Sequence, residues 1–407
     1  MTTTQWICCQ LGAREHYAVP RALHRRARLR MMVTDAWTRP GSPIAHLPGQ
    51  LPRRLAERYH PDLESADVRD LTLSLMKQEV EWRLQRRTGW DLLIARNEWF
   101  QAGAASLLAD AEKPSPARIV VFAHSYSARA IFQLAKARGW TTVLGQIDPG
   151  EDHFAIVRRL ADASPQYGAA PALPPIDYFE RWREECALAD HIVVNSEWSR
   201  KAVTRAGVDP ARLRVLPLAY DGSAEPPPAP RVFPVRFTAA RPLRLLFVGS
   251  ASVVKGAPHL LEAMSLLAGQ PVTLRLVGEP AMTVPAAFLN HPGIDWVGAV
   301  PRGEMAQHYE TSDVLVFPSH SDGFGMAQIE AQGHGLPVIA SPFCGGVVRD
   351  GHNGLLLAEV TAHSIAGAVR SLLNTPALLG QFSANAATGG EDALIRLGAE
   401  LMRLVKT

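Results

Sequence analysis

The sequence predicts an α/β protein of two domains, each with a parallel β-sheet covered by helices. Apolar runs typical of strands buried on both faces alternate with helical patterns in both halves of the chain, as at residues 119–123, 243–248 and 314–317. The 407 residues, 47% hydrophobic and 20% charged, are enough for two ordinary cores. Four prolines between residues 226 and 230 indicate a linker between the domains.

The first half contains apolar runs that predict strands at residues 6–9, 31–33, 119–123, 141–144 and 190–194. Helical patterns cover residues 20–28 and 71–87, and Ser196 is a candidate N-cap for the helix that follows it. A further apolar run at residues 92–95 predicts a strand that leads into a helix ending near Leu108.

Polar side chains follow two of these strands. His124 comes directly after one, while Gln146 and Asp148 follow the next, with His153 a few residues later. Ligands of open parallel sheets bind at the carboxyl ends of the strands, so His124 is a candidate cleft residue. A histidine at a strand end is about as often structural, and both interpretations stay open for His124.

The second half opens with a buried strand that ends at Gly249, followed by a short loop from Ser250 and by Lys255 before a helix over residues 258–267. A lysine at a helix start is a suitable counter-charge for a phosphate group. The plainer alternative is a surface lysine.

A second strand, glycine loop and helix unit covers residues 314–331. Gly323 and Gly325 precede a helical pattern, and the N–H groups at a helix start favour phosphate. Glu330, inside that helix, and Asp322, in the loop, are placed to accept hydrogen bonds from sugar or ribose hydroxyls. Alternatively, Asp322 caps the helix and Glu330 is a solvated helix residue.

Residues 322–331, Asp-Gly-Phe-Gly-Met-Ala-Gln-Ile-Glu-Ala, resemble the signature E-G-F-G-x-x-x-x-E-A of retaining family-4 glycosyltransferases with the GT-B fold. The resemblance continues through residues 335–341, 345–346 and 350–356, and through residues 190–200 and 207–217 of the first half. It implies two Rossmann-like parallel-sheet domains that face each other across a cleft.

The resemblance also implies site residues. Catalytic roles fall on Lys255, Asp322 and Glu330, with His124 and Asp148 from the first domain. Donor contacts fall on Gly249, Ser250, Lys255, Gly278, Val300, Asp322, Gly323, Phe324, Gly325, Met326 and Glu330. Gly12, Gln146 and His153 lie on the acceptor side.

Asp322 stands where the family signature has glutamate, and the sequence departs from the family in four further places. Ser250 replaces the usual arginine, the glycine loop after Gly346 is shortened, and the first loop keeps only Gly12 of its small residues. The usual cleft histidine has no single successor, because Gln146, Asp148 and His153 all lie near its place.

The implied activity is transfer of a sugar from a nucleotide diphosphate sugar, with UDP favoured over GDP, to a glycan, glycolipid or small-molecule acceptor, with retention at the anomeric carbon. No Asp-x-Asp sequence occurs, so no essential metal and no cofactor are expected. The alternatives are a non-catalytic nucleotide-sugar-binding scaffold and a GT-B epimerase, and turnover of the donor eliminates the scaffold.

The expected division is residues 1–221 for the acceptor-binding domain, 222–240 for the linker, and 241–385 for the nucleotide-sugar-binding domain. Residues 386–407 are expected to form a terminal helix that packs back across the interface.

Charge is spread unevenly although the net charge is only +3. Residues 1–220 carry 30 Lys and Arg against 24 Asp and Glu, and five arginines lie between Arg21 and Arg30. This arginine cluster (Arg21, Arg25, Arg26, Arg28 and Arg30) suggests peripheral contact with an anionic membrane, although a solvated helix face is the commoner explanation. Nothing indicates nucleic-acid binding.

The sequence favours a cytoplasmic protein, with the inner face of the membrane as an alternative site. Its four cysteines lack metal-ligand spacing, and no secretion signal or membrane span is apparent.

Overall fold

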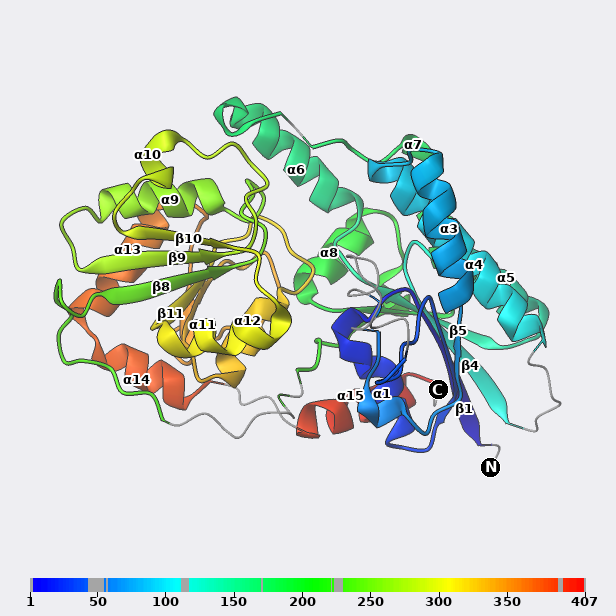
Figure 1. The fold of residues 1–407 in the computed structure, drawn as a ribbon. Helices are drawn as coiled ribbons and strands as arrows, with labels where there is room; N and C mark the ends of the chain where they lie inside the picture. Colours follow the sequence, from blue (N-terminus) through cyan, green and yellow to red (C-terminus); the bar gives the residue numbers. More distant parts are fainter. Residues whose placement is uncertain are drawn as a thin grey trace.

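Two parallel sheets form the two halves of the molecule, a computed structural model that describes residues 3–42, 55, 58–110, 117–169, 171–220, 222, 230–386 and 391–405 (Figure 1). The first sheet has seven strands in the order β3-β2-β1-β4-β5-β6-β7, and the second has six in the order β10-β9-β8-β11-β12-β13. The strand pairs among the described residues are parallel, as the apolar runs buried on both faces predict. The predicted fold class is confirmed.

The elements of the first sheet and its covering layers follow in chain order. Its strands are β1 (Thr4–Gln10), β2 (Leu29–Thr34), β3 (Val68–Asp70), β4 (Arg118–His124), β5 (Thr141–Gln146), β6 (His191–Val194) and β7 (Leu213–Val215). Its helices are α1 (Ala18–His24), α3 (Thr72–Leu84), α4 (Gly89–Asp110), α5 (Arg129–Ala137), α6 (Glu151–Ala163), α7 (Ile176–Leu188) and α8 (Glu197–Arg205), with 3₁₀ turns η1 (Arg14–Tyr17), η3 (Pro61–Leu63), η4 (Pro165–Tyr167) and η5 (Pro210–Arg212).

The second sheet is built in the same way. Its strands are β8 (Leu243–Val248), β9 (Val272–Val277), β10 (Ile294–Gly298), β11 (Val314–Phe317), β12 (Val338–Ala340) and β13 (Gly354–Leu356). The remaining helices are α9 (Ala257–Leu266), α10 (Ala286–Leu289), α11 (Met305–Thr311), α12 (Met326–Gly333), α13 (Ala362–Asn374), α14 (Ala377–Ala384) and α15 (Glu391–Leu404), with the 3₁₀ turn η6 (Arg302–Glu304).

The predicted strand at residues 92–95 is wrong, because these residues lie inside the 22-residue helix α4. The run contains no breaker, and Trp90 and Ile94, one helical turn apart, both pack against the core of the first sheet. A short apolar run fits a buried helix turn as well as a strand. Here the helix is stabilised by packing on the neighbouring α3, where Trp82 contacts Trp99 of α4.

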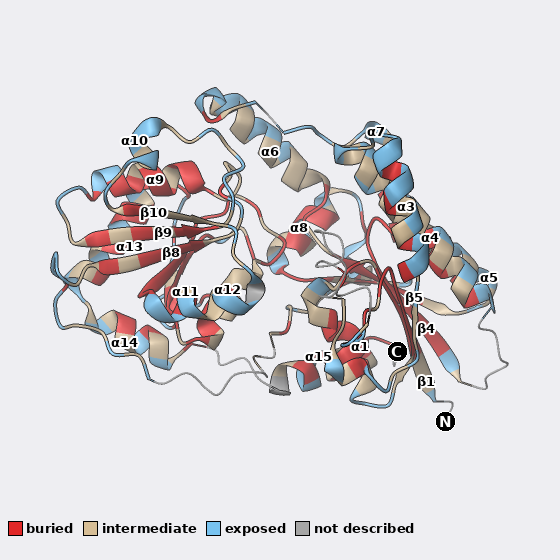
Figure 2. Cartoon of the chain, in the orientation of Figure 1, coloured by how far each residue is buried: buried red, intermediate tan, exposed pale blue. Residues whose placement is uncertain are grey.

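The last helix returns to the first half of the molecule. Leu394, Leu397 and Leu401 of α15 share a core cluster with Val19 and Leu23 of α1. Figure 1 shows α15 beside α1, and Figure 2 shows buried residues gathered around the two sheets. Asp221 and most of the expected linker lie outside the described residues. No helix formed by the described residues is both long and apolar enough to cross a bilayer.

Candidate active site

The glycine loop before α12 holds its shape through Gly325. This residue is the N-cap of α12 and has a φ of 84°, a left-handed conformation that favours glycine. A Cβ at Gly325 would lie 2.5 Å from the ring of Phe317 at the end of β11. The helix start therefore lies close to the carboxyl end of the strand, and the N–H groups of a helix start are suited to an anion.

Lys255 lies beside this loop and pairs with Asp322. The ammonium contacts the Asp322 carboxylate, and both side chains are partly exposed, at 30% and 17%. Gly256 fixes the position of Lys255, because a Cβ there would lie 2.0 Å from the carbonyl oxygen of Pro318. The loop after β8 and the loop after β11 thus bring together a cation and a carboxylate that are 67 residues apart.

Glu330 is held in place by a residue that the sequence does not single out. The Tyr309 hydroxyl on α11 donates a hydrogen bond of 2.7 Å to one oxygen of Glu330. Burial and the neighbouring carboxylate raise the pKa of Tyr309 well above its usual range, so the phenol keeps its proton. Tyr309 is itself stacked on His334 at 5.3 Å. A tyrosine 21 residues upstream carries no sequence signal of this role.

Three glycines bring the strand ends of the second sheet into backbone contact. Gly249 and Gly278 have φ values of 122° and 131°, and a Cβ at Gly278 would lie 2.2 Å from the carbonyl oxygen of Gly249. Gly278 N–H donates to Gly298 at 2.8 Å. Ser250 follows at an exposed position, and Val300 is partly buried against the core cluster that contains Val277.

Asp148 of the first domain is oriented by three donors at the end of β5. One carboxylate oxygen accepts from the Tyr126 hydroxyl at 2.7 Å, the Gly150 N–H at 2.9 Å and the Gln146 amide at 3.2 Å. Gln146 is buried and accepts from the Trp182 indole at 2.8 Å. Gln146 therefore orients Asp148, and its own oxygen is committed to Trp182.

The glycine loop of the second domain rests on this strand end. A Cβ at Gly323 would lie 2.7 Å from the Ile147 carbonyl oxygen and 3.3 Å from the Asp148 Cα. The Ser196 hydroxyl donates to the Gly323 carbonyl at 2.6 Å. Ser196 also caps α8, as predicted, by accepting from the Ser199 N–H. The first domain thus binds the backbone of the loop that carries Asp322.

His153 completes a four-residue group between the domains. Its Nδ1 lies 3.1 Å from the hydroxyl of Ser321. Burial lowers its pKa and Lys255 lowers it further, while Asp148 and Asp322 act in the opposite direction. We call Lys255, Asp322, Asp148 and His153 the transfer centre. Two residues of each domain therefore share one electrostatic environment, although the sequence analysis left the roles of Asp148 and His153 unresolved.

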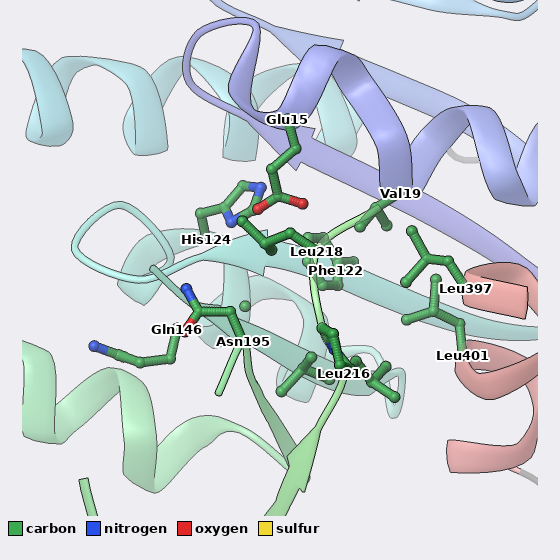
Figure 3. A pocket seen from close by; sticks show the side chains of 13 residues that line it. Glu15, Val19, Phe122, His124, Gln146, Asn195, Leu216, Leu218, Leu397 and Leu401 are labelled. Atoms are coloured by element: carbon green, nitrogen blue, oxygen red, sulfur yellow. The ribbon is translucent and has the colours of Figure 1, made fainter. Parts of the chain in front are cut away.

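His124 lies outside this centre. It is 4% exposed, its Nδ1 has no hydrogen-bond partner among the described residues, and burial together with nearby Arg14 lowers its pKa to about 3, so it is neutral. It lines a cavity of about 30 Å³, into which Glu15 points from η1 toward the histidine ring (Figure 3). Gly12 is also placed structurally, because its N–H donates to Asp35 at 2.9 Å.

A larger cavity of about 380 Å³ opens on the first domain, and we call it the acceptor cavity. It is lined by the loop after β4, the start of α4 and the loop after β1: Leu11, Arg14, Gly89, Leu92, Leu93, Arg96, Asn97, His124, Ser125, Tyr126, Ser127, Ile147 and Tyr178. Both charged residues of its lining are arginines. Arg96 is paired with Glu79 at 2.9 Å, whereas the exposed Arg14 side chain makes no hydrogen bond or ion pair with the described residues.

Two facing Rossmann-like domains, with charged strand-end and helix-start residues between them, define a GT-B protein. Residues 242–375 match the model of the glycosyl transferases group 1 family.

Curated relatives agree with this assignment. The D-inositol 3-phosphate glycosyltransferase of Geodermatophilus obscurus is 32% identical over 220 residues, which cover 47% of each chain. That of Kineococcus radiotolerans is 33% identical over 233 residues, covering 49% of this chain and 52% of the relative. The chain spans about half the length of the curated relatives it matches.

Solved structures share the fold over nearly the whole chain. Sucrose-phosphate synthase from Thermosynechococcus elongatus has a TM-score of 0.64 at 19% identity, with 98% of both chains covered. Anabaena HepE in complex with UDP and glucose has a TM-score of 0.61 at 14% identity, with 99% of both chains covered.

Proposed function

We propose that this protein is a retaining, metal-independent glycosyltransferase that moves a sugar from a UDP-sugar to an acceptor bound in the first domain. The observation that carries the proposal is the transfer centre, in which Lys255 and Asp322 of the donor side meet Asp148 and His153 of the acceptor side. The solved relative HepE binds UDP and UDP-glucose, which supports uridine as the base.

In this proposal the donor diphosphate lies at the start of α12. Negative charge develops on the diphosphate as the sugar leaves, and Lys255 with the helix N–H groups stabilises it electrostatically. Glu330, held by Tyr309, keeps one carboxylate oxygen for ribose hydroxyls, and Asp322 binds hydroxyls of the sugar once Lys255 turns to the diphosphate. In this proposal Lys255 and the helix N–H groups supply the positive charge that a bound metal supplies in other enzymes.

The acceptor enters through the acceptor cavity. Ile147 lines this cavity and is adjacent in sequence to Asp148, so an acceptor there reaches the transfer centre. The leaving phosphate takes the acceptor proton on the same face, which gives retention. The exposed Arg14 in the lining favours an acceptor that carries a phosphate group, and the curated relatives are named for a phosphorylated inositol. A lipid-linked carbohydrate phosphate offers the same anionic group.

Calorimetric titration with UDP, GDP and ADP, with and without magnesium, tests the donor site. We expect UDP to bind most tightly, with an affinity that magnesium does not change, and Glu330→Ala to abolish binding. Glu310→Ala is the matched control, because Glu310 lies nearby on α11 with its side chain 61% exposed. If none of the three nucleotides binds to the wild type, the proposed function is wrong.

A further inference from the structure

Helix α3 presents an apolar stripe to solvent. Leu73, Val80 and Leu84 are exposed at 79%, 57% and 80%, although a large aliphatic side chain is usually buried when a partner is available. They recur at the spacing of one helix face, with exposed Lys77 between them. The opposite side of α3 is buried through Leu75 and Trp82, which pack in a cluster with Trp99 of α4. The stripe therefore points directly away from the first domain.

Cations surround this stripe. Lys77, Arg83 and Arg86 are exposed, and their side chains make no hydrogen bond or ion pair within the part of the chain that the structure describes. The acids of the helix do not balance them, because Glu79 is 8% exposed and paired with Arg96. Glu81 is exposed and accepts from two glutamine side chains. We call Leu73, Lys77, Val80, Arg83, Leu84 and Arg86 the α3 outer face.

The α3 outer face lies next to the acceptor cavity. Helix α3 ends at Leu84, and five residues later the chain reaches Gly89, which starts α4 and lines the cavity. Leu93, one turn further along, also lines the cavity and is 40% exposed. Figure 2 shows α3 as a largely exposed helix beside α4 at the outer edge of the molecule. A surface that contacts α3 is therefore close to the place where an acceptor enters.

The arginine cluster near the start of the chain does not offer such a surface. Arg21 is 1% exposed and donates to Asp62 at 2.9 Å, and Arg25 shares the same carboxylate. Arg26 donates to the carbonyl oxygen of Ile395 on α15 at 2.8 Å. Three of its five arginines therefore bind other groups of the same chain, and their guanidinium groups are less available to an outside partner.

We propose that the α3 outer face docks on an anionic phospholipid bilayer. Aliphatic side chains flanked by lysine and arginine match the interfacial region of a membrane, where apolar groups enter the acyl boundary and cations meet lipid phosphates. The docked protein opens its acceptor cavity toward the membrane surface. Docking does not depend on the proposed transfer reaction, but it would present a lipid-borne acceptor to it.

Co-sedimentation of the full chain with vesicles tests the docking. We expect binding to vesicles of phosphatidylglycerol and phosphatidylcholine, and little binding to phosphatidylcholine alone. The triple variant Leu73→Ser, Val80→Ser, Leu84→Ser and the double variant Lys77→Glu, Arg83→Glu should each lower binding at least about tenfold. Because these side chains are exposed, the variants should keep the wild-type melting temperature.

Two controls match these changes. Leu289→Ser removes an aliphatic side chain that is 52% exposed on α10, and Arg28→Glu reverses a charge of the arginine cluster outside the Asp62 contacts. Both should leave vesicle binding unchanged. Equal binding by the α3 variants and the wild type overturns the proposal, and so does an absence of binding by the wild type. Self-association that the triple variant abolishes, in sedimentation velocity without vesicle binding, would assign the face to a second copy instead.

Discussion

Asp322 is the counter-ion of Lys255. In the proposed donor site, the Asp322 carboxylate therefore competes with the diphosphate of the nucleotide for the Lys255 ammonium. A diphosphate that takes Lys255 leaves Asp322 without its cation. A donor that also carries a sugar offers hydroxyls to Asp322, whereas UDP alone does not. The pair should therefore favour the intact donor over the product UDP.

We expect Asp322→Asn to tighten UDP binding by about three- to tenfold, because the competing carboxylate is gone. The affinity for UDP-glucose should rise less or fall, so that the preference for the donor over UDP decreases. Calorimetry with both ligands measures this ratio, and Asp295→Asn, at an exposed ion pair on β10, serves as the control. Weaker UDP binding by Asp322→Asn would contradict the competition.

His124 makes the stability of the first domain sensitive to acid. The pKa of His124 is lowered from 6.5 to about 3 in the folded protein. Between these pH values His124 is protonated in the unfolded chain and neutral in the folded chain. Above pH 6.5 His124 is neutral in both states, so it takes nothing from the free energy of unfolding. As the pH falls from 6.5 toward 3, the free energy of unfolding declines by up to about 1.4 kcal/mol per pH unit.

Urea denaturation of wild type and His124→Asn at pH 7 and pH 5 tests this linkage. Between these pH values the wild type should lose about 2 kcal/mol more stability than the variant, because only the wild type has this proton-linked term. Other histidines with a lowered pKa, such as His320, remain in both proteins and cancel in the difference. Parallel losses in the two proteins would show that His124 is protonated in the folded state.

At the scale of the elements, the strand ends and the loops after them carry the site. The sequence predicts the second domain well because its strands are apolar on both faces and its glycines mark close backbone contacts. The prediction fails at residues 92–95, where a short apolar run belongs to α4, and it gives no element to residues 14–17. In that loop Glu15, His16 and Tyr17 all have positive φ, a conformation that the residue types do not signal.

The element that positions Lys255 is the turn at Gly256. We expect Gly256→Ala to lower the free energy of unfolding by roughly 2–4 kcal/mol, because the new Cβ would meet the Pro318 carbonyl and φ is 71°. Gly269→Ala is the matched control: its φ is 77°, but nothing lies within 4 Å of the Cβ position, so only roughly 1 kcal/mol should be lost. Equal losses in denaturant unfolding would mean that the Pro318 contact does not constrain the turn.

At the scale of the whole molecule, the domains meet through backbone and hydroxyl contacts that sequence patterns do not encode. The Ser196 hydroxyl binds the Gly323 carbonyl, and His153 and the Trp198 indole both reach the Ser321 hydroxyl. The positions of Lys255, Asp322 and Glu330 are predictable because each of them lies within a continuous motif. The positions of Asp148, His153 and Tyr309 are not, because they depend on packing between segments far apart in the chain.

The measurement that tests the central claim most directly is UDP release from UDP-glucose by the purified protein, with D-inositol 3-phosphate as a trial acceptor. Wild type should release UDP, slowly without acceptor and faster with it, and Lys255→Ala should lower the rate at least about tenfold. If UDP binds but no nucleotide sugar, whether of uridine, guanosine or adenosine, is ever turned over, the site binds nucleotides without catalysing transfer. That result would contradict the account.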